Sequence, residues 1–325
     1  MNISVLPSQQ IEKKKWDTFI EQSREANIYA TYDYLQHCER QWKAAILEDE
    51  TGYQAVMPFQ VSRKWGIEYI YQDPFARELG IFTIKELTKV QYQALLDASL
   101  GSYRYVARYH FNVNNSLLLS ENTFQKGGES KPTVTFHLDL RQSYEKIWKK
   151  YRQDRRYSIK RAQRYDQQII EEKQVHDALT LFRETTYHRI PGLAPYQLPM
   201  MEKLYLSLLA SGKLEAYYAS YEGEKIAAAL VVRYKKKLIY LFGTNNETAF
   251  RLRTSSLLLD HIIRKYAEQD LIFDFEGGEV PSLGSFYASF GAAKKVIPGY
   301  SKVHLPVFVR WLLKLRKKVI QKKRG

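Results

Sequence analysis

Two stretches of the chain repeat the same order of apolar and polar positions. In each, an apolar strand leads into an acidic turn with a glycine, and a second apolar strand, a basic turn and an aromatic strand follow. Residues 45–71 and 218–241 share this order when Gly52 is aligned with Gly223. Repetition of a whole supersecondary pattern at one offset predicts a duplicated domain. The alternative is that two ordinary antiparallel meanders look alike.

The second half predicts three antiparallel strands, a helix, a short strand, a small helix and one or two final strands. These elements are expected at residues 214–222, 225–234, 237–245, 257–268, 273–276, 283–290 and 294–305. Before them, a strand is predicted at residues 133–138, one long basic helix at 142–166 and another helix at 176–188. This order predicts a sheet flanked by helices.

A length of 325 residues suits two domains of about 150 residues each. The best linker is the segment around residues 127–132, where two glycines and a proline replace any apolar period. We therefore expect an N-terminal domain at residues 1–126, a second domain at 133–309 and a tail at 310–325.

Composition indicates a folded soluble protein, with 45% hydrophobic and 26% charged residues. No stretch approaches the roughly 20 apolar residues of a membrane span, and the N-terminus lacks a secretory signal pattern. These observations predict a cytoplasmic location. The lone Cys38 has no disulfide partner and sits in no metal-ligand spacing, so no metal site is expected.

The net charge of +15 predicts an anionic partner, such as nucleic acid, a phosphorylated ligand or an acidic membrane surface. From Lys146 to Arg164 there are nine basic residues and one acidic residue, which is either a binding face or a solvated helix face. Residues 310–325 form a basic amphipathic tail. This tail suits docking on anionic lipid at the inner membrane face or on nucleic-acid phosphate, and the alternative is a terminal helix packed on its domain.

Several short blocks along the chain resemble the FemABX branch of the GNAT acyltransferase superfamily. In the second half these blocks are residues 156–162, 186–189, 273–278, 285–287 and 290–292, and in the first half they are 57–59, 74–75 and 79–80. The order of strands and helices in the second half is also that of the GNAT fold. The chain has no long heptad segment like the helical arm of the cell-wall Fem proteins, so it is more similar to the shorter relatives.

The resemblance implies an α/β (α+β) fold with tandem GNAT-like domains, each a mixed, mostly antiparallel sheet flanked by helices. It implies transfer of an acyl or aminoacyl group to an amine acceptor, such as a cell-envelope precursor. The donor is either a coenzyme A thioester or an aminoacyl-tRNA, used as a co-substrate, with no permanently bound cofactor. The competing hypothesis, which rests on charge alone, is a non-enzymatic protein that binds RNA or an anionic membrane surface.

The predicted donor site is the start of the helix after the third strand of the second meander. A helix N-terminus offers free backbone N–H groups to phosphate, and the candidates there are Arg251, Arg253, Thr254, Ser255 and Ser256. Arg251 fits the GNAT pattern, but Thr254 and Ser256 occupy positions that are glycine in typical coenzyme A-binding members. Side chains there resemble the Fem-type proteins that use aminoacyl-tRNA. The alternative is surface charge with helix capping by Thr254.

Asp274 and Glu276 alternate with phenylalanines, so both carboxylates are expected on one face of a strand. We predict Glu276 as the general base that deprotonates the amine. Asp274 is a second catalytic candidate, and its alternative role is a structural hydrogen bond to the Gly-Gly turn. Tyr287 is a candidate proton donor to the leaving group, with simple packing as the alternative.

Acceptor contacts are predicted where a helix ends before a Pro-Gly loop. Arg189 is the first candidate for an acceptor phosphate or carboxylate, because its planar guanidinium suits either group. His188 beside it and Tyr240 on the aromatic strand are further substrate-binding candidates. The active site is expected in the second domain, because Pro58 and the lack of a paired-carboxylate strand argue against chemistry in the first.

Overall fold

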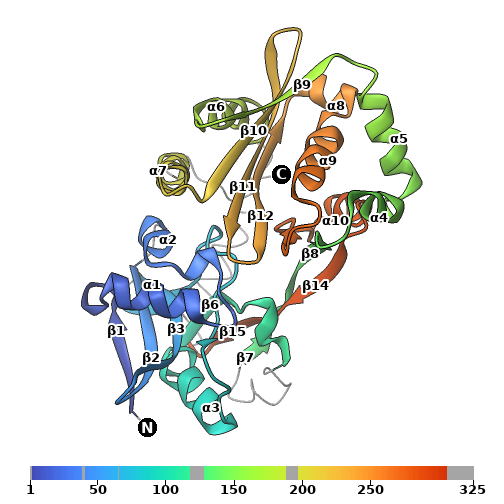
Figure 1. The fold of residues 1–325 in the computed structure, drawn as a ribbon. Coiled ribbons are helices and arrows are strands. Elements are labelled where there is room, and N and C mark those ends of the chain that lie inside the picture. The colour runs from blue at the N-terminus through green and yellow to red at the C-terminus, as the bar shows by residue number, and fades with distance from the viewer. Residues whose placement is uncertain (1, 39–40, 65, 118–127, 188–196, 306–325) are drawn as a thin grey trace. The chain divides into compact units, whose positions relative to one another are not determined.

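The computed structural model describes residues 2–38, 41–64, 66–117, 128–187 and 197–305. The chain divides into two compact units, each built on one sheet (Figure 1). The first unit contains the residues up to Thr133 and those from Ile297 onward, and the second contains Val134–Val296.

The sheet of the first unit is mostly antiparallel, and β4 and β6 form its parallel pair. Its strands lie in the order β1 (Asn2–Pro7), β2 (Gln41–Asp49), β3 (Gly52–Lys64), β4 (Ile67–Tyr71), β6 (Tyr105–His110), β15 (Gly299–Val303) and β7 (Gly128–Ser130), with β5 (Phe82–Thr83) pairing with β3. The central position of β3 explains its sequence, a near-continuous buried run from Ala55 to Val61.

The helices of the first unit place apolar side chains on this sheet. They are α1 (Lys13–Gln22), α2 (Tyr32–His37), α3 (Lys89–Ala98) and the short 3-10 turns η1 (Ser8–Gln10), η2 (Ile28–Ala30), η3 (Leu100–Ser102) and η4 (Val113–Leu117). Trp16 of α1 is fully buried and its ring packs 5.1 Å from that of Trp42 in β2. Helix α3 begins with a capping box between Thr88 and Gln91, a frequent helix start.

The sheet of the second unit repeats this plan, with β12 and β13 as its parallel pair. Its strands lie in the order β9 (Gln167–Glu172), β10 (Leu214–Tyr221), β11 (Glu224–Tyr234), β12 (Lys237–Asn245), β13 (Ile272–Asp274), β8 (Thr133–Asp139) and β14 (Ala293–Ile297). Each sheet therefore has an outer strand, a three-stranded antiparallel meander, a parallel neighbour and then two more strands. This confirms the predicted duplication.

Helices cover both faces of the second sheet, with α6 and α7 on one side and α5 and α9 on the other (Figure 1). The helices of this unit are α4 (Tyr144–Lys150), α5 (Gln153–Ala162), α6 (His176–Thr185), α7 (Gln197–Ala210), α8 (Glu247–Leu252), α9 (Thr254–Tyr266) and α10 (Pro281–Ala288). Because β11 is covered on both faces, every side chain from Ile226 to Val232 is buried. That strand accordingly reads as a continuous apolar run instead of an alternating one.

The two meanders turn at the glycines on which the repeat was aligned. Gly52 and Gly223 both have positive φ angles, of 111° and 82°. The glycine at each position relieves the clash that a Cβ atom would cause in this conformation. The same backbone requirement at the same place in both units explains why the acidic turn with glycine recurs.

At two places, strands that are consecutive in the sequence belong to different sheets. Strand β8 follows β7 along the chain but completes the second sheet, and β15 follows β14 but pairs with β6 and β7 of the first. The sequence predicted residues 127–132 as a linker and 294–305 as the end of the second domain. In the structure, part of each segment lies in the first sheet, because a strand pattern specifies a strand but not the sheet it joins.

The long helix predicted at residues 142–166 is two helices, α4 and α5. Tyr151 and Arg152 between them have extended backbone angles, with ψ of 136° and 154°. Tyr151 is buried, and its ring meets the ring of Phe290 edge-on at 5.2 Å. Burying this aromatic side chain turns the chain, so the basic residues lie on two short helices.

The substitution Gly299→Ala tests how closely β15 packs against the segment that follows β7. A Cβ atom on Gly299 would lie 1.8 Å from the carbonyl oxygen of Lys131, whose N–H donates to Gly299 O at 2.8 Å. We expect the free energy of unfolding to fall by about 1–3 kcal/mol, as for other overpacked sites. Urea denaturation measures it. The control is Gly101→Ala, whose Cβ would meet the flexible Asp97 carboxylate at 3.3 Å; equal losses in both variants would contradict the close pairing.

Candidate functional site

The second sheet opens between β12 and β13. The parallel pairing covers Lys237 to Ile239 and ends at the pair Ile239 and Asp274, while β12 continues to Asn245. The β11–β12 ladder contains a bulge beside Tyr240. Beyond Ile239, no strand of the described chain pairs with this edge of β12. Backbone N–H groups along such an edge can bind a carbonyl oxygen that gains negative charge.

Asp274 lies at the last paired position and is 2% exposed. Its carboxylate accepts a hydrogen bond from Thr135 Oγ1 at 2.5 Å, and its Oδ2 lies 3.1 Å from Nε2 of His137. Burial raises the pKa of Asp274, but the hydrogen bonds and charges of His137, Lys237 and Thr135 outweigh burial and lower it below the usual range. The carboxylate is therefore ionised and held by protein groups at neutral pH.

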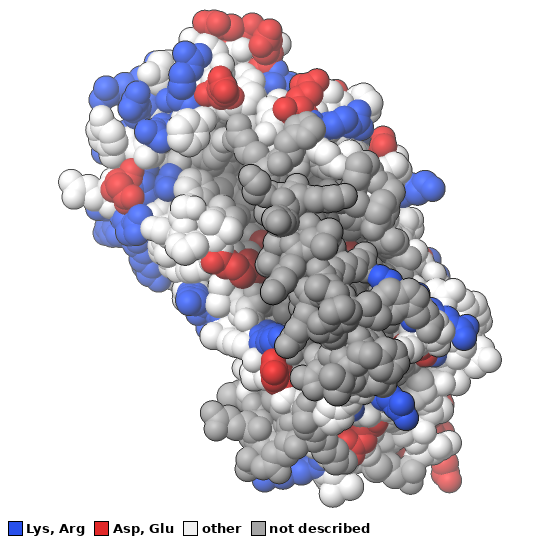
Figure 2. Space-filling view, turned by 180° about the vertical axis from the view of Figure 1, so that it is seen from behind, with Lys and Arg blue, Asp and Glu red and all other residues white. Residues whose placement is uncertain are grey.

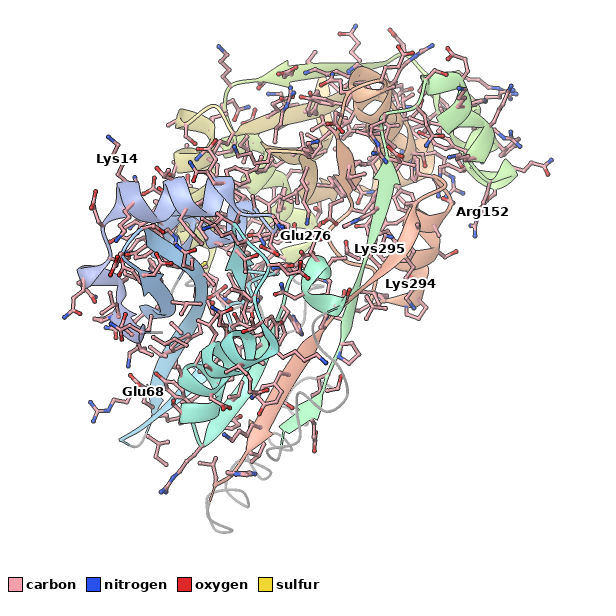
Figure 3. The ribbon with its side chains drawn as sticks, turned by 60° about the horizontal axis from the view of Figure 1, so that its bottom comes forward. Lys14, Glu68, Arg152, Glu276, Lys294 and Lys295 are labelled. Carbon is pink, nitrogen blue, oxygen red and sulfur yellow. The ribbon has the colours of Figure 1, made fainter. Side chains whose placement is uncertain are left out.

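Glu276 lies two residues beyond the end of β13 (Figure 3). Its backbone N–H donates to Asp274 Oδ1 at 3.0 Å, and its φ angle is 47°, which is unusual for a residue with a side chain. Its side chain is half-buried. Burial raises the pKa of Tyr205, and the negative charge of Glu276 raises it further. Asp274 thus fixes the backbone that carries Glu276.

Aromatic rings line this end of β13. Tyr287 of α10 packs 4.8 Å from Phe275, 6.3 Å from Phe136 and 6.4 Å from Tyr240. It is 5% exposed, which favours the packing role considered for it. Burial raises the pKa of Tyr240, and its hydroxyl occupies the place where a Cβ atom on Gly243 would lie. Tyr240 therefore keeps its proton at neutral pH and can donate a hydrogen bond.

The predicted donor residues at the start of α9 are engaged with other side chains. Thr254 is fully buried and donates to Gln167 Oε1 at 2.5 Å. Ser256 is 3% exposed and accepts a hydrogen bond from the guanidinium of Arg155. Ser255 Oγ accepts from Asn245 Nδ2 at 3.0 Å. The capping role considered for Thr254 is wrong, because Arg253 in the left-handed conformation is the N-cap and Thr254 is the first helical residue.

Arg155 is a buried cation beside this helix end. Its Nε donates to Ser289 Oγ at 2.8 Å, and its guanidinium lies 4.2 Å from the ring centre of Phe286. Burial lowers its pKa to about 10. Arg155 therefore remains charged at neutral pH and occupies the N-terminal side of α9 with the hydroxyl of Ser256.

The remaining predicted arginines, Arg251 and Arg253, are exposed near the junction of α8 and α9. Arg251 lines a groove of about 670 Å³ at the end of β12. The other lining residues are Glu184, Thr185, Asn245, Asn246, Glu247, Thr248 and Phe250. The guanidinium of Arg253 lies 5.6 Å from the ring centre of Phe250. Most of the lining residues are polar or charged, and the exposed ring of Phe250 adds apolar surface, so the groove suits a substrate with both polar and apolar parts.

The structure thus gathers Asp274, Tyr240 and Tyr287 at the strand opening, with Glu276 just beyond β13. Arg251 lies at the polar groove, while Thr254, Ser255 and Ser256 contribute to packing at α9. The predicted acceptor residues His188 and Arg189 and the tail at residues 310–325 lie outside the described residues.

Sequence reasoning missed Thr135, His137, Arg155 and Gln167. Thr135 and His137 alternate on a predicted strand, but nothing local identifies Asp274 as their partner across the sheet. Arg155 precedes the buried Ile159 by four residues, which placed it on the apolar side of its helix. That spacing is the one signal that distinguished Arg155 from the basic residues around it.

The described residues contain no group of three or more His, Cys, Asp or Glu side chains placed to hold a metal ion. Among the helices of the described chain, none has the length and apolar character needed to cross a bilayer.

Comparison with known proteins finds a family model that matches part of the second unit. Residues 149–281 match the family described as an acetyltransferase (GNAT) domain. No curated protein sequence matches the chain significantly. The structure is similar to the crystal structure of FemX, with a TM-score of 0.68 and 11% identity over 96% of this chain and 99% of that one.

Two further solved structures share the architecture. L-PGS from Bacillus licheniformis has a TM-score of 0.56 and 12% identity, over 94% of this chain and 96% of that one. A tandem GNAT protein from the clavulanic acid biosynthesis pathway has a TM-score of 0.55 and 8% identity, over 94% and 99%. At these identities the likeness concerns the fold. Together with the family match, it confirms the predicted tandem GNAT-like architecture of the FemABX type.

The network around Asp274 yields a prediction about stability. Asp274→Asn removes the negative charge that faces His137 and Lys237, so we expect the free energy of unfolding at pH 7 to fall by about 2 kcal/mol. The folded pKa of Asp274 is below its unfolded value, so its contribution is present above about pH 4 and is lost as the pH falls further.

The difference between wild type and Asp274→Asn should therefore shrink between about pH 5 and pH 2 in urea titrations. The control is Asp270→Asn, because Asp270 pairs with Lys236 at the surface and exposed pairs add little stability. A difference that stays constant over this range would show that the charge of Asp274 does not stabilise the fold.

Proposed function

We propose that this chain, whose residues 149–281 match the acetyltransferase (GNAT) domain family, is a FemABX-like N-acyltransferase that transfers an aminoacyl group from aminoacyl-tRNA to an amine. The proposed active site lies in the second unit, at the opening between β12 and β13. The choice of donor goes beyond the family assignment and rests on the start of α9.

The filled N-terminus of α9 supports aminoacyl-tRNA over coenzyme A. A pyrophosphate bound at a helix N-terminus needs close approach to the backbone N–H groups. Here Thr254 and Ser256 are buried, and Arg155 hydrogen-bonds to Ser256 at the same helix end. Side chains thus stand at the helix start, at positions where glycine would allow a pyrophosphate to approach the backbone closely. The phosphates of a tRNA lie along its backbone, so this donor does not require that cradle.

In the proposed reaction, the amine nitrogen attacks the aminoacyl carbonyl carbon and forms the new C–N bond. Glu276 accepts the proton that the nitrogen loses. The ester C–O bond then breaks, and the ribose oxygen takes up a proton and leaves as a hydroxyl. The position of Glu276 next to the strand opening, on a backbone held by Asp274, supports its role as base.

Two other groups at the opening have proposed roles. The hydroxyl of Tyr240 donates a hydrogen bond to the carbonyl oxygen as negative charge develops there. Its raised pKa keeps that proton in place at neutral pH. Asp274 is a positioning residue, since its oxygens already accept hydrogen bonds from Thr135 and the Glu276 N–H. Tyr287 forms an aromatic wall of the site.

The polar groove at the end of β12 is the proposed entrance for charged parts of the substrates. Arg251 suits a phosphate of the donor, and the carboxylates of Glu184 and Glu247 suit ammonium groups. Acceptor binding by His188 and Arg189 stays a prediction, as does membrane contact through residues 310–325. A tRNA donor also implies that the enzyme works in the cytoplasm.

The base assignment predicts that Glu276→Gln lowers the transfer rate about 10²–10⁴-fold, because the amide cannot accept the proton. The measurement is single-turnover transfer from radiolabelled aminoacyl-tRNA to a protein-free extract of small-molecule and lipid amines. Glu279→Gln, three residues along and exposed, is the matched control and should retain activity. Circular dichroism should show that both variants are folded. Equal activity of both variants would exclude Glu276 as the base.

The donor assignment is tested by calorimetry with acetyl-coenzyme A and free coenzyme A at about 150 mM salt, where surface attraction is screened. We expect no saturable heat with either ligand and formation of labelled product from aminoacyl-tRNA. One-site binding of coenzyme A that is lost in Arg251→Ala would overturn the tRNA proposal in favour of an acyl-coenzyme A donor.

A further inference from the structure

About half of the chain's net charge is concentrated on α4, α5 and the residues that directly follow α5. Nine basic residues and one acidic residue between Lys146 and Arg164 give +8 of the total +15. In Figure 2, blue side chains gather along the upper left edge, which carries α4 and α5. The break at Tyr151 and Arg152 presents this charge on two short helices.

Most of this charge points to solvent. Arg155 is turned inward and is 8% exposed. The remaining basic residues are exposed or half-exposed, and six of them define what we call the α4–α5 basic face: Lys149, Arg152, Arg156, Lys160, Arg161 and Arg164. Of these, Arg152 pairs with Asp154 at 2.9 Å (Figure 3). Arg156, Lys160, Arg161 and Arg164 form no ion pair within the described part of the chain.

The spacing of these residues makes a continuous row. Arg156 and Lys160 are four residues apart on one side of α5, about 6 Å apart along its axis, and Arg152 is the N-cap four residues before Arg156. A row of separate cations at such intervals suits a chain of phosphates better than it suits one small anion.

An exposed aromatic side chain lies in the same region. Tyr157 is 62% exposed, although tyrosine usually buries its ring. It precedes Arg161 by four residues, so the two share one side of α5, and Arg164 lies in the turn just after the helix. An exposed ring among cations is the arrangement on which proteins stack unpaired bases of single-stranded nucleic acid.

The apolar side of α5 is already used. Ile159 is fully buried in the core of the second unit, and Ala162 is buried as well. A helix that lies in a membrane interface needs an apolar face to insert. Tyr157 is the one large apolar side chain that α5 exposes, so the face suits RNA better than a lipid surface.

We propose that the α4–α5 basic face binds the sugar-phosphate backbone of an RNA, with Tyr157 stacking on an unpaired base. The inference rests on the proposed function, because it identifies this RNA as the aminoacyl-tRNA donor. The face lies in the second unit, which also contains the proposed active site. It gives the chain a binding surface for the donor that is separate from the groove at Arg251.

The test is fluorescence anisotropy with labelled, uncharged total tRNA over a range of salt concentrations. Because each phosphate contact contributes about 0.7–0.9 to the slope of log K against log salt, Arg156→Gln with Lys160→Gln should reduce that slope by about 1.5. Tyr157→Ala should weaken binding about tenfold and leave the slope unchanged.

The matched control is Lys14→Gln with Lys89→Gln, which removes two exposed charges from helices of the first unit. It should bind tRNA like wild type with the same slope. If both double variants behave alike, the α4–α5 basic face is not the RNA surface. If Arg156→Gln with Lys160→Gln instead loses binding to phosphatidylglycerol vesicles and keeps tRNA binding, the face docks on lipid and the proposal is overturned.

This experiment separates the inference from the proposed reaction, because uncharged tRNA binds without turnover. A smaller slope of log K against log salt in the α4–α5 double variant, but not in its control, would support the RNA surface. This holds even if the Glu276→Gln measurement excluded Glu276 as the base. If the wild-type protein transfers the aminoacyl group but the two double variants bind tRNA equally well, the proposed reaction stands. The α4–α5 basic face is then excluded as the RNA surface.

Discussion

The hydrogen bonds of the buried Asp274 carboxylate hold the position at which β12 and β13 part. Thr135 and His137 engage it from β8, and the Glu276 N–H engages it from the following turn. A buried carboxylate is stable only when such partners compensate for lost hydration. The carboxylate therefore ties three segments together where the parallel pairing ends, and the arrangement of Glu276 and Tyr240 depends on it.

The first unit differs at the equivalent position, where its parallel strand pair ends. Its parallel pair, β4 and β6, ends near Tyr71, and the segment from Gln72 to Gly80 returns along β6. Gln72 N donates to Arg108 O at 3.1 Å, and Leu79 N donates to His110 O at 3.0 Å. The chain that continues from β4 thus stays hydrogen-bonded to β6, whereas in the second unit β12 continues past the end of its pairing with β13. This contrast supports the expectation that chemistry belongs to the second unit.

The basic residues of α5 have two different environments. Arg155 packs inward between Ser256, Ser289 and aromatic rings at the start of α9. The neighbouring Arg156 and Lys160 face solvent. The proposed aminoacyl-tRNA donor is argued from both features, the side chains at the start of α9 and the row of exposed cations on α5.

The sequence by itself determined the duplicated meanders, the order of the later elements and the GNAT-like fold class. Those features depend on apolar periodicity and turn glycines such as Gly52 and Gly223, which act over a few residues. It also located Asp274, Glu276 and Tyr240. Only the tertiary structure decided that β15 joins the first sheet, that Thr135 and His137 hold Asp274, and that Arg155 fills the start of α9. Each of these contacts joins residues about 100 or more positions apart, and local patterns do not specify such partners.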